Sequence, residues 1–159
     1  MALFGLGSKK DPQISSVQDP GWVRSPGGRF HRFIVLDAEK EGLSGIGGIY
    51  AIWHGGVRPE WVYIGKSNDL AATFQELAGN GDIRNYNVRG GLFVSWALIR
   101  EEFRNGVLYF LNDSMKPLVP NPDIPGKGVT PIPVIGPLTE YKEIVGSAEK
   151  DPAPPTPRV

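Results

Sequence analysis

Two short apolar runs joined by a turn, with a helical pattern after them, constrain this chain most, and they lie between Gly48 and Gly79. β-Branched and aromatic residues dominate both runs, which read GIYAIW and WVYIG, and the link between them holds two glycines and a proline. Such a pattern is typical of a β-hairpin with a longer loop. From Asp69 to Gly79 the apolar residues recur at helical spacing. The sequence therefore predicts a strand, a turn, a strand and a helix, with Asn68 or Asp69 as the N-cap.

Further segments complete the expected fold. Strands are predicted at 29–36 (RFHRFIVL) and at 90–99 (GGLFVSWALI), the second of them buried and central. A helix is expected from about 105 to 115, where apolar residues gather on one face. Residues 79–89 are expected to be a polar turn region, and His54 a solvated loop residue. The fold class is thus α+β, a small central sheet of about three to four strands, including the hairpin, with flanking helices.

Extended arms are expected on both sides of this α/β domain, which is assigned to residues 29–120. Residues 1–28 mix Gly, Pro, Ser, Asp and Lys without periodicity and predict an irregular N-terminal arm. Residues 121–159 are rich in proline, which favours an extended arm and tail; proline excludes a helix over 119–137 and leaves room for a short one at 138–144. Their apolar residues favour docking, on this domain or on a partner. The candidates for partner contact in the two arms are Leu3, Phe4, Leu6, Ile132, Val134 and Ile135.

Composition limits the classes of function. The 17 basic and 17 acidic residues balance, which argues against a surface built throughout for nucleic acid. There is no cysteine and there are only two histidines, so disulfides, thiol chemistry and cysteine- or histidine-rich metal sites are excluded. No apolar run approaches the roughly 18 residues of a membrane span, and the N-terminus lacks the pattern of a signal peptide. We therefore expect a cytoplasmic protein with no membrane span and no cofactor.

The hairpin resembles the signature of the GIY-YIG nuclease family. Gly48-Ile49-Tyr50 matches the first triplet, and Tyr63-Ile64-Gly65 matches the second, with a helix after it at the expected place. In that family a small sheet with flanking helices cuts DNA with two tyrosines, a helix arginine and a glutamate that binds a divalent metal. The resemblance covers about residues 48–121. It implies the same fold here, with Tyr50, Tyr63 and Gly65 as remnants of the motif.

Two functional residues of that family do not carry over. The position of the helix arginine holds Thr73, and no arginine occurs between Gly65 and Arg84. The position of the metal-binding glutamate, counted back from Pro117, holds Leu108. Charge that develops on a phosphoryl group needs a cation nearby, and a hard metal ion needs oxygen ligands. The resemblance therefore implies a degenerate, catalytically inactive domain, with no catalytic residue and no metal.

Three functions follow as alternatives. The favoured one is a protein-interaction or assembly subunit of a larger complex, whose terminal arms grip partner proteins. The second is a nucleic-acid-binding domain that has lost cleavage. The third is an active, Mg²⁺-dependent endonuclease in which Arg84 or Arg89 replaces the helix arginine. Backbone N–H groups at a strand-to-helix turn hold anions, so the candidates for contact with nucleic acid or an anion are Lys66, Ser67, Asn68, Arg84 and Arg89.

Overall fold

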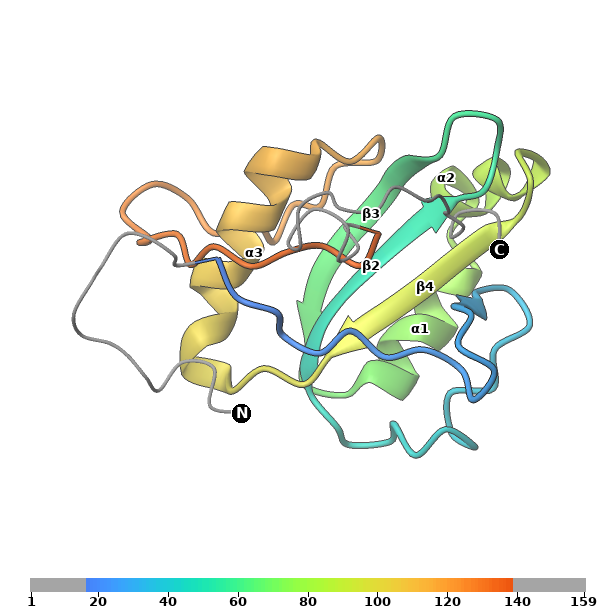
Figure 1. Ribbon diagram of the computed structural model, residues 1–159, viewed down its shortest axis with the longest axis horizontal. Coiled ribbons are helices and arrows are strands. Elements are labelled where there is room, and N and C mark those ends of the chain that lie inside the picture. The colour runs from blue at the N-terminus through green and yellow to red at the C-terminus, as the bar shows by residue number, and fades with distance from the viewer. Residues whose placement is uncertain (1–16, 139–159) are drawn as a thin grey trace, which may run out of the picture.

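A computed structural model describes residues 17–138 of the chain. Its centre is a four-stranded antiparallel sheet with the strand order β1-β4-β2-β3 (Figure 1). The fold is α+β, as the sequence predicts. No helix in this part of the chain is both long and apolar enough to cross a membrane. The elements are β1 (His31–Arg32), β2 (Gly48–His54), β3 (Glu60–Ser67), α1 (Leu70–Ala78), α2 (Gly81–Arg84), the 3-10 helix η2 (Asn85–Val88), β4 (Leu92–Ala97) and α3 (Glu101–Met115).

The predicted hairpin and its helix are present. β2 pairs with β3 from Gly48 opposite Ser67 to His54 opposite Glu60, and β4 pairs with the other side of β2. All residues of β2 and of β4 are buried, because both faces of the sheet are covered, and this explains their nearly continuous apolar runs. The side chain of Asp69 accepts a hydrogen bond from the Ala72 amide and so caps α1, as expected.

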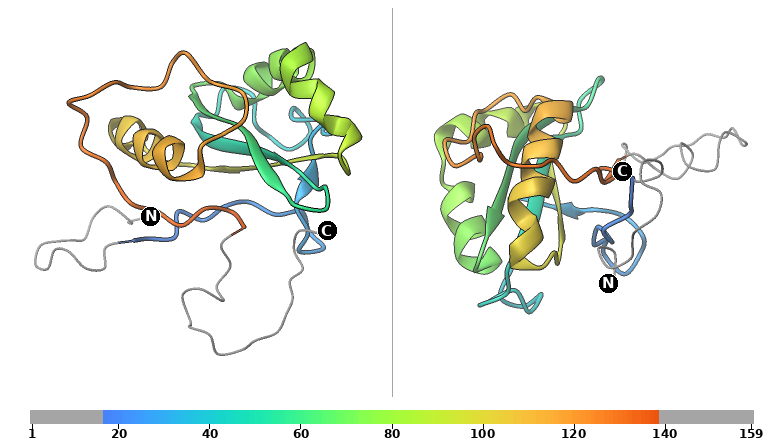
Figure 2. Two further views of the ribbon diagram at one scale, coloured as in Figure 1. Left: turned by 90° about the horizontal axis from the view of Figure 1, so that it is seen from above. Right: turned by 90° about the vertical axis from the view of Figure 1, so that its left-hand side faces the viewer.

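The helices cover opposite faces of the sheet (Figure 2). Successive residues of a strand point to opposite faces. On β2, Tyr50 and Ile52 belong to the core under α1 and α2, together with Phe74. Ile49 and Ala51 belong to the core under α3, with the α3 residues Val107, Leu108 and Leu111. A functional side chain on this sheet therefore meets either α1 or α3, according to its place in the alternation.

The described parts of both arms lie on their own domain. Gln18 pairs with Val134 in a parallel bridge, and the Trp22 indole donates a hydrogen bond of 2.7 Å to the Ile135 carbonyl. Val134 is buried in the core under α3, and Ile132 packs against the same core. Figure 1 shows the two segments, in blue and in red, beside each other. Of the two docking alternatives left open by the sequence, residues 17–28 and 121–138 adopt the one on their own domain.

The N-terminal arm and the segment just before the C-terminal arm also cover the sheet edges. The Val23 amide donates to the Trp96 carbonyl of β4 at 2.9 Å. On the opposite edge, the Leu118 amide donates to the Trp61 carbonyl of β3 at 3.0 Å. Uncovered edge groups act as templates for pairing with another chain. These two segments therefore satisfy the edge carbonyls within the chain itself.

The strand expected at 29–36 is wrong in its length, because only the two residues of β1 pair with β4. After β1, the Phe33 amide donates to the Leu92 carbonyl, and the chain then turns. Phe33 enters the core under α1 with 2% exposure, whereas Val35 is 75% exposed. The apolar run at 33–36 thus reflects a turn packed over a helix rather than a strand.

Two helical boundaries also differ from the expectation. Residues 79–89, expected as turns, contain α2 and η2, because the Asn80 side chain caps the Ile83 amide and Ile83 is fully buried. α3 begins at Glu101 rather than near 105. Its first turn holds Glu101 and Glu102, and carboxylates are favourable at a helix N-terminus. Charge in the segment before an apolar stripe marked the start of the helix, not a loop.

Candidate functional site

The two tyrosines of the family triplets lie side by side on the α1 face of the sheet. Their ring centroids are 6.3 Å apart and their planes differ by 22°. Phe74 of α1 meets the Tyr50 ring edge-on at 5.5 Å. Tyr50 is 3% exposed, and Tyr63, on the edge strand β3, is half-buried. The fold thus brings the two motif residues together, with Tyr50 inside the core.

Gly65 provides the space for the Tyr50 hydroxyl. It lies opposite Tyr50 in the register of β2 and β3. A Cβ atom at residue 65 would lie 2.4 Å from Tyr50 Oη and 2.8 Å from Asn121 Nδ2. The side-chain amide of Asn121 also donates, through Nδ2, to the Ile64 carbonyl at 2.9 Å. The glycine of the second triplet therefore lets the tyrosine of the first triplet lie against the β3 backbone, beside Asn121 of the C-terminal arm.

The surroundings of this pair favour the neutral phenol. Burial raises the pKa of Tyr50 far above its ordinary value, and the neighbouring Tyr63, Asp123 and Glu76 raise it further. Burial and the same two carboxylates also raise the pKa of Tyr63. A general base works best when its pKa lies near the working pH. Both hydroxyls are therefore suited to hydrogen bonding rather than to proton abstraction.

This arrangement predicts a loss of stability in alkali. Tyr50 keeps its proton in the folded state, whereas an unfolded tyrosine ionises near its ordinary pKa of 10.0. Because the unfolded state then binds fewer protons, the free energy of unfolding should fall above about pH 10, by about 1.4 kcal/mol per pH unit for this one group. Urea unfolding of the protein and of Tyr50→Phe, from pH 8 to beyond 10, measures it. Equal slopes in the two proteins would contradict the prediction.

The two positions that differ from the family have structural roles here. Thr73 Oγ1 lies 2.7 Å from Ser67 Oγ, which also accepts a hydrogen bond from the Asp69 amide. Thr73 thus helps to close the turn into α1. Leu108 is completely buried under α3, on the sheet face opposite to Tyr50. Within residues 17–138, no group of three His, Asp or Glu side chains is placed to hold a metal ion.

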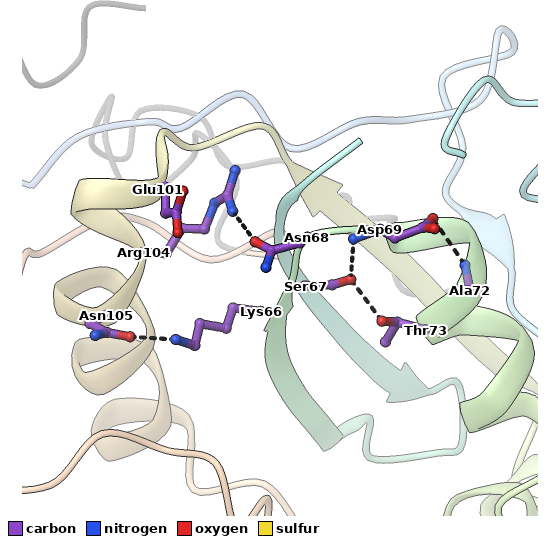
Figure 3. Close-up of a pocket in the computed structure, with 9 residues that line it drawn as sticks. All are labelled: Lys66, Ser67, Asn68, Asp69, Ala72, Thr73, Glu101, Arg104 and Asn105. Atoms are coloured by element: carbon purple, nitrogen blue, oxygen red, sulfur yellow. Dashed lines mark hydrogen bonds between the residues drawn. The ribbon is translucent and has the colours of Figure 1, made fainter. Parts of the chain in front are cut away.

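Only part of the expected anion-binding set comes together. Lys66, Ser67 and Asn68 line a pocket of about 510 Å³ between the start of α1 and the start of α3 (Figure 3). Arg84 instead donates to the Ala78 carbonyl at 2.8 Å. Arg89 lies 3.8 Å from Glu60, at the far end of β3 from Lys66. A strand of this length spans roughly 20 Å, so the five candidates do not form one site.

The pocket also contains two residues outside the five anion-binding candidates. Arg104 and Asn105, from the first turns of α3, form the wall opposite Lys66 and Asn68. The sequence indicated Arg104 only as one of several cations that could gather on one face, and Asn105 only as the start of a helix. Beside the tyrosine pair, Glu76, Asn121 and Asp123 were missed, since nothing in their spacing connects them with Tyr50. One feature of the sequence could have placed the start of α3 at 101: the acidic residues Glu101 and Glu102, which are favourable in the first turn of a helix.

The expectation that His54 is a solvated loop residue is wrong. It is the last residue of β2 and is 2% exposed. The Gly56 amide donates to its Nδ1 at 3.2 Å, so the ring proton is on Nε2, which donates to Glu60 Oε1 at 3.1 Å. The ring also stacks on Tyr86. The histidine therefore anchors the hairpin loop, because β2 continues one residue past its apolar run.

The six candidates for partner contact fall into two groups. Leu3, Phe4 and Leu6 lie outside the described residues. Val134 is buried, and Ile132 and Ile135 are half-buried on their own domain.

No family model matches the chain, and neither a curated protein nor a solved structure matches it. The GIY-YIG resemblance accordingly rests on the two triplets and the helix that follows them.

Proposed function

We propose that this chain is a catalytically inactive GIY-YIG-like domain and a protein-interaction subunit of a larger assembly. The observation that supports inactivity most is the environment of the tyrosine pair. The negative charges of Asp123 and Glu76 act on Tyr50 and Tyr63. Phosphoryl transfer needs cations at such a site instead. Thr73 is bound to Ser67, and Leu108 is buried on the other face of the sheet. Positions that would supply the cation and the metal ligand thus serve the fold.

A protein partner is better supported than nucleic acid. The chain has a formal net charge of zero, and its cationic candidates lie at both ends of β3, with Arg89 beside a carboxylate. Affinity for nucleic acid depends on several cations that neutralise neighbouring phosphates. Because residues 17–28 and 121–138 cover their own domain, we assign partner contact to Leu3, Phe4 and Leu6. A cytoplasmic location belongs to the same proposal.

Affinity capture from the native organism tests this proposal. The full-length protein is compared with a variant in which Leu3, Phe4 and Leu6 are all changed to serine. We expect a stoichiometric protein partner, and about tenfold less of it with the variant, because three apolar anchors are lost. The control replaces two exposed apolar residues of the domain, as Val35→Ser with Leu98→Ser (75% and 55% exposed), and should retain the partner.

Three other outcomes would contradict the proposal. Capture of nucleic acid that is released steeply by salt, and equally by all variants, would favour the alternative of a nucleic-acid-binding domain. Nicking of supercoiled plasmid that requires Mg²⁺ would favour the active endonuclease. Capture of neither a protein partner nor nucleic acid, by the full-length chain or by its variants, would also count against the assembly role, because that role requires a partner.

A further inference from the structure

We propose that the pocket between α1 and α3 binds the phosphomonoester group of a small, hydroxyl-rich molecule such as a sugar phosphate. This site is separate from the tyrosine pair and goes beyond the proposed assembly role. The pocket is lined by the end of β3, the start of α1 and the first turns of α3 (Figure 3). Its volume of about 510 Å³ is in the usual range for small-molecule sites.

Two cations line the pocket without carboxylate partners. Lys66 Nζ donates to Asn105 Oδ1 at 2.8 Å, and Arg104 donates to Asn68 Oδ1 at 3.0 Å. Arg104 Nε also donates to the Ile99 carbonyl at 2.7 Å, which fixes the guanidinium. Neither cation forms an ion pair within the described part of the chain. Their charges are therefore available to an anion, and phosphate oxygens form strong bonds with such groups.

The asparagines add a neutral donor to the same site. Because their Oδ1 atoms accept from Lys66 and Arg104, the Nδ2 groups of Asn68 and Asn105 are left to donate. An ammonium, a guanidinium and the amide NH₂ group of Asn68 thus come from opposite walls of one pocket, whereas the Asn105 nitrogen lies on the side of its amide away from Lys66. The ammonium and the guanidinium each keep further N–H donors beyond the bonds described above, and charge-assisted hydrogen bonds to phosphate oxygens are strong.

The carboxylates in the pocket narrow the class of ligand. Glu101 and Asp69 also line it, and Asp69 Oδ1 already accepts from the Gly45 and Ala72 amides. A nucleic-acid strand would bring further phosphates close to these acids, where like charges repel. Ligand hydroxyls, by contrast, donate hydrogen bonds to carboxylates. One terminal phosphate with neighbouring hydroxyls fits the two cations and the two acids together.

Isothermal titration of the full-length protein with ribose 5-phosphate, inorganic phosphate and ribose tests the site. We expect ribose 5-phosphate to bind most tightly, inorganic phosphate more weakly and ribose least. Lys66→Met should weaken binding of ribose 5-phosphate about tenfold, because one charge-assisted hydrogen bond is lost. Asn105→Ala, at an exposed position of α3, should weaken it in the same direction. The matched control Lys127→Met removes an exposed lysine outside the pocket and should leave the affinity unchanged.

The result that overturns the proposal is binding of ribose 5-phosphate that is absent, or equal in Lys66→Met, Asn105→Ala and Lys127→Met. A single-stranded oligonucleotide that binds more tightly than ribose 5-phosphate, and loses affinity in Lys66→Met, would also overturn it in favour of a nucleic-acid strand. Far-ultraviolet circular dichroism of each variant checks that the fold is retained. These readouts do not depend on capture of a protein partner, so either proposal can fail without the other.

Discussion

Leu108→Glu is expected to unfold the domain rather than restore the family's metal site. The variant places a glutamate at the position that the resemblance to GIY-YIG nucleases would assign to the metal ligand. Leu108 is completely buried among apolar residues of the sheet and α3, including Ile49 and Ile64. An unpaired carboxylate there loses its hydration, and we expect the free energy of unfolding to fall by about 4 kcal/mol or more. Urea unfolding followed by tryptophan fluorescence measures it.

The control for this substitution is Leu108→Met, which keeps apolar character and approximate volume and should cost less than about 1.5 kcal/mol. A plasmid-nicking assay with Mg²⁺ accompanies both variants. A folded Leu108→Glu protein that cuts DNA would show that α3 can present this residue to the tyrosine pair. That result would contradict both the buried position of Leu108 and the proposed inactivity.

The sequence predicts best the elements whose burial gives a regular pattern of apolar residues. β2 and β4 are buried on both faces, so their apolar runs indicate strands directly. α1 has both its cap, Asp69, and its apolar spacing in the sequence. The run at 33–36 is equally apolar, but it packs as a turn because β1 ends where the Phe33 side chain enters the core. Local pattern alone does not distinguish these two kinds of burial.

The candidate sites were harder to predict because their parts come from distant segments. Lys66 and Asn105 are 39 positions apart, and they meet only because α3 packs across the end of β3. Arg84 and Arg89 are near Lys66 in sequence, yet they lie toward the other end of the sheet. Asn121 reaches Gly65 only through the path of the C-terminal arm. Residue spacing within one helix or strand therefore predicted that element, whereas the sequence did not predict which charged residues tertiary packing brings together.

Gly65→Ala is expected to destabilise the domain by about 3 kcal/mol, near the upper end for overpacking a core. The new methyl group would lie 2.4 Å from Tyr50 Oη, 2.7 Å from Tyr50 Cζ and 2.8 Å from Asn121 Nδ2. Tyr50 has little room to move, because it is buried and Phe74 packs against its ring. Either the tyrosine or the Asn121 segment must therefore shift. Urea unfolding gives the change in stability.

Gly81→Ala is the matched control, because a Cβ at this exposed residue of α2 would meet nothing within 4 Å. It should be neutral or stabilising by up to about 1 kcal/mol. The double variant Tyr50→Phe with Gly65→Ala separates the cause: removal of the hydroxyl should make Gly65→Ala less damaging than it is alone, giving a coupling energy of about 1 kcal/mol. Additive effects would mean that Gly65 is needed for the backbone of β3 and not for Tyr50. A coupling would instead tie the glycine of one triplet to the tyrosine of the other, as expected if the close approach of the Tyr50 hydroxyl is what requires a glycine at position 65.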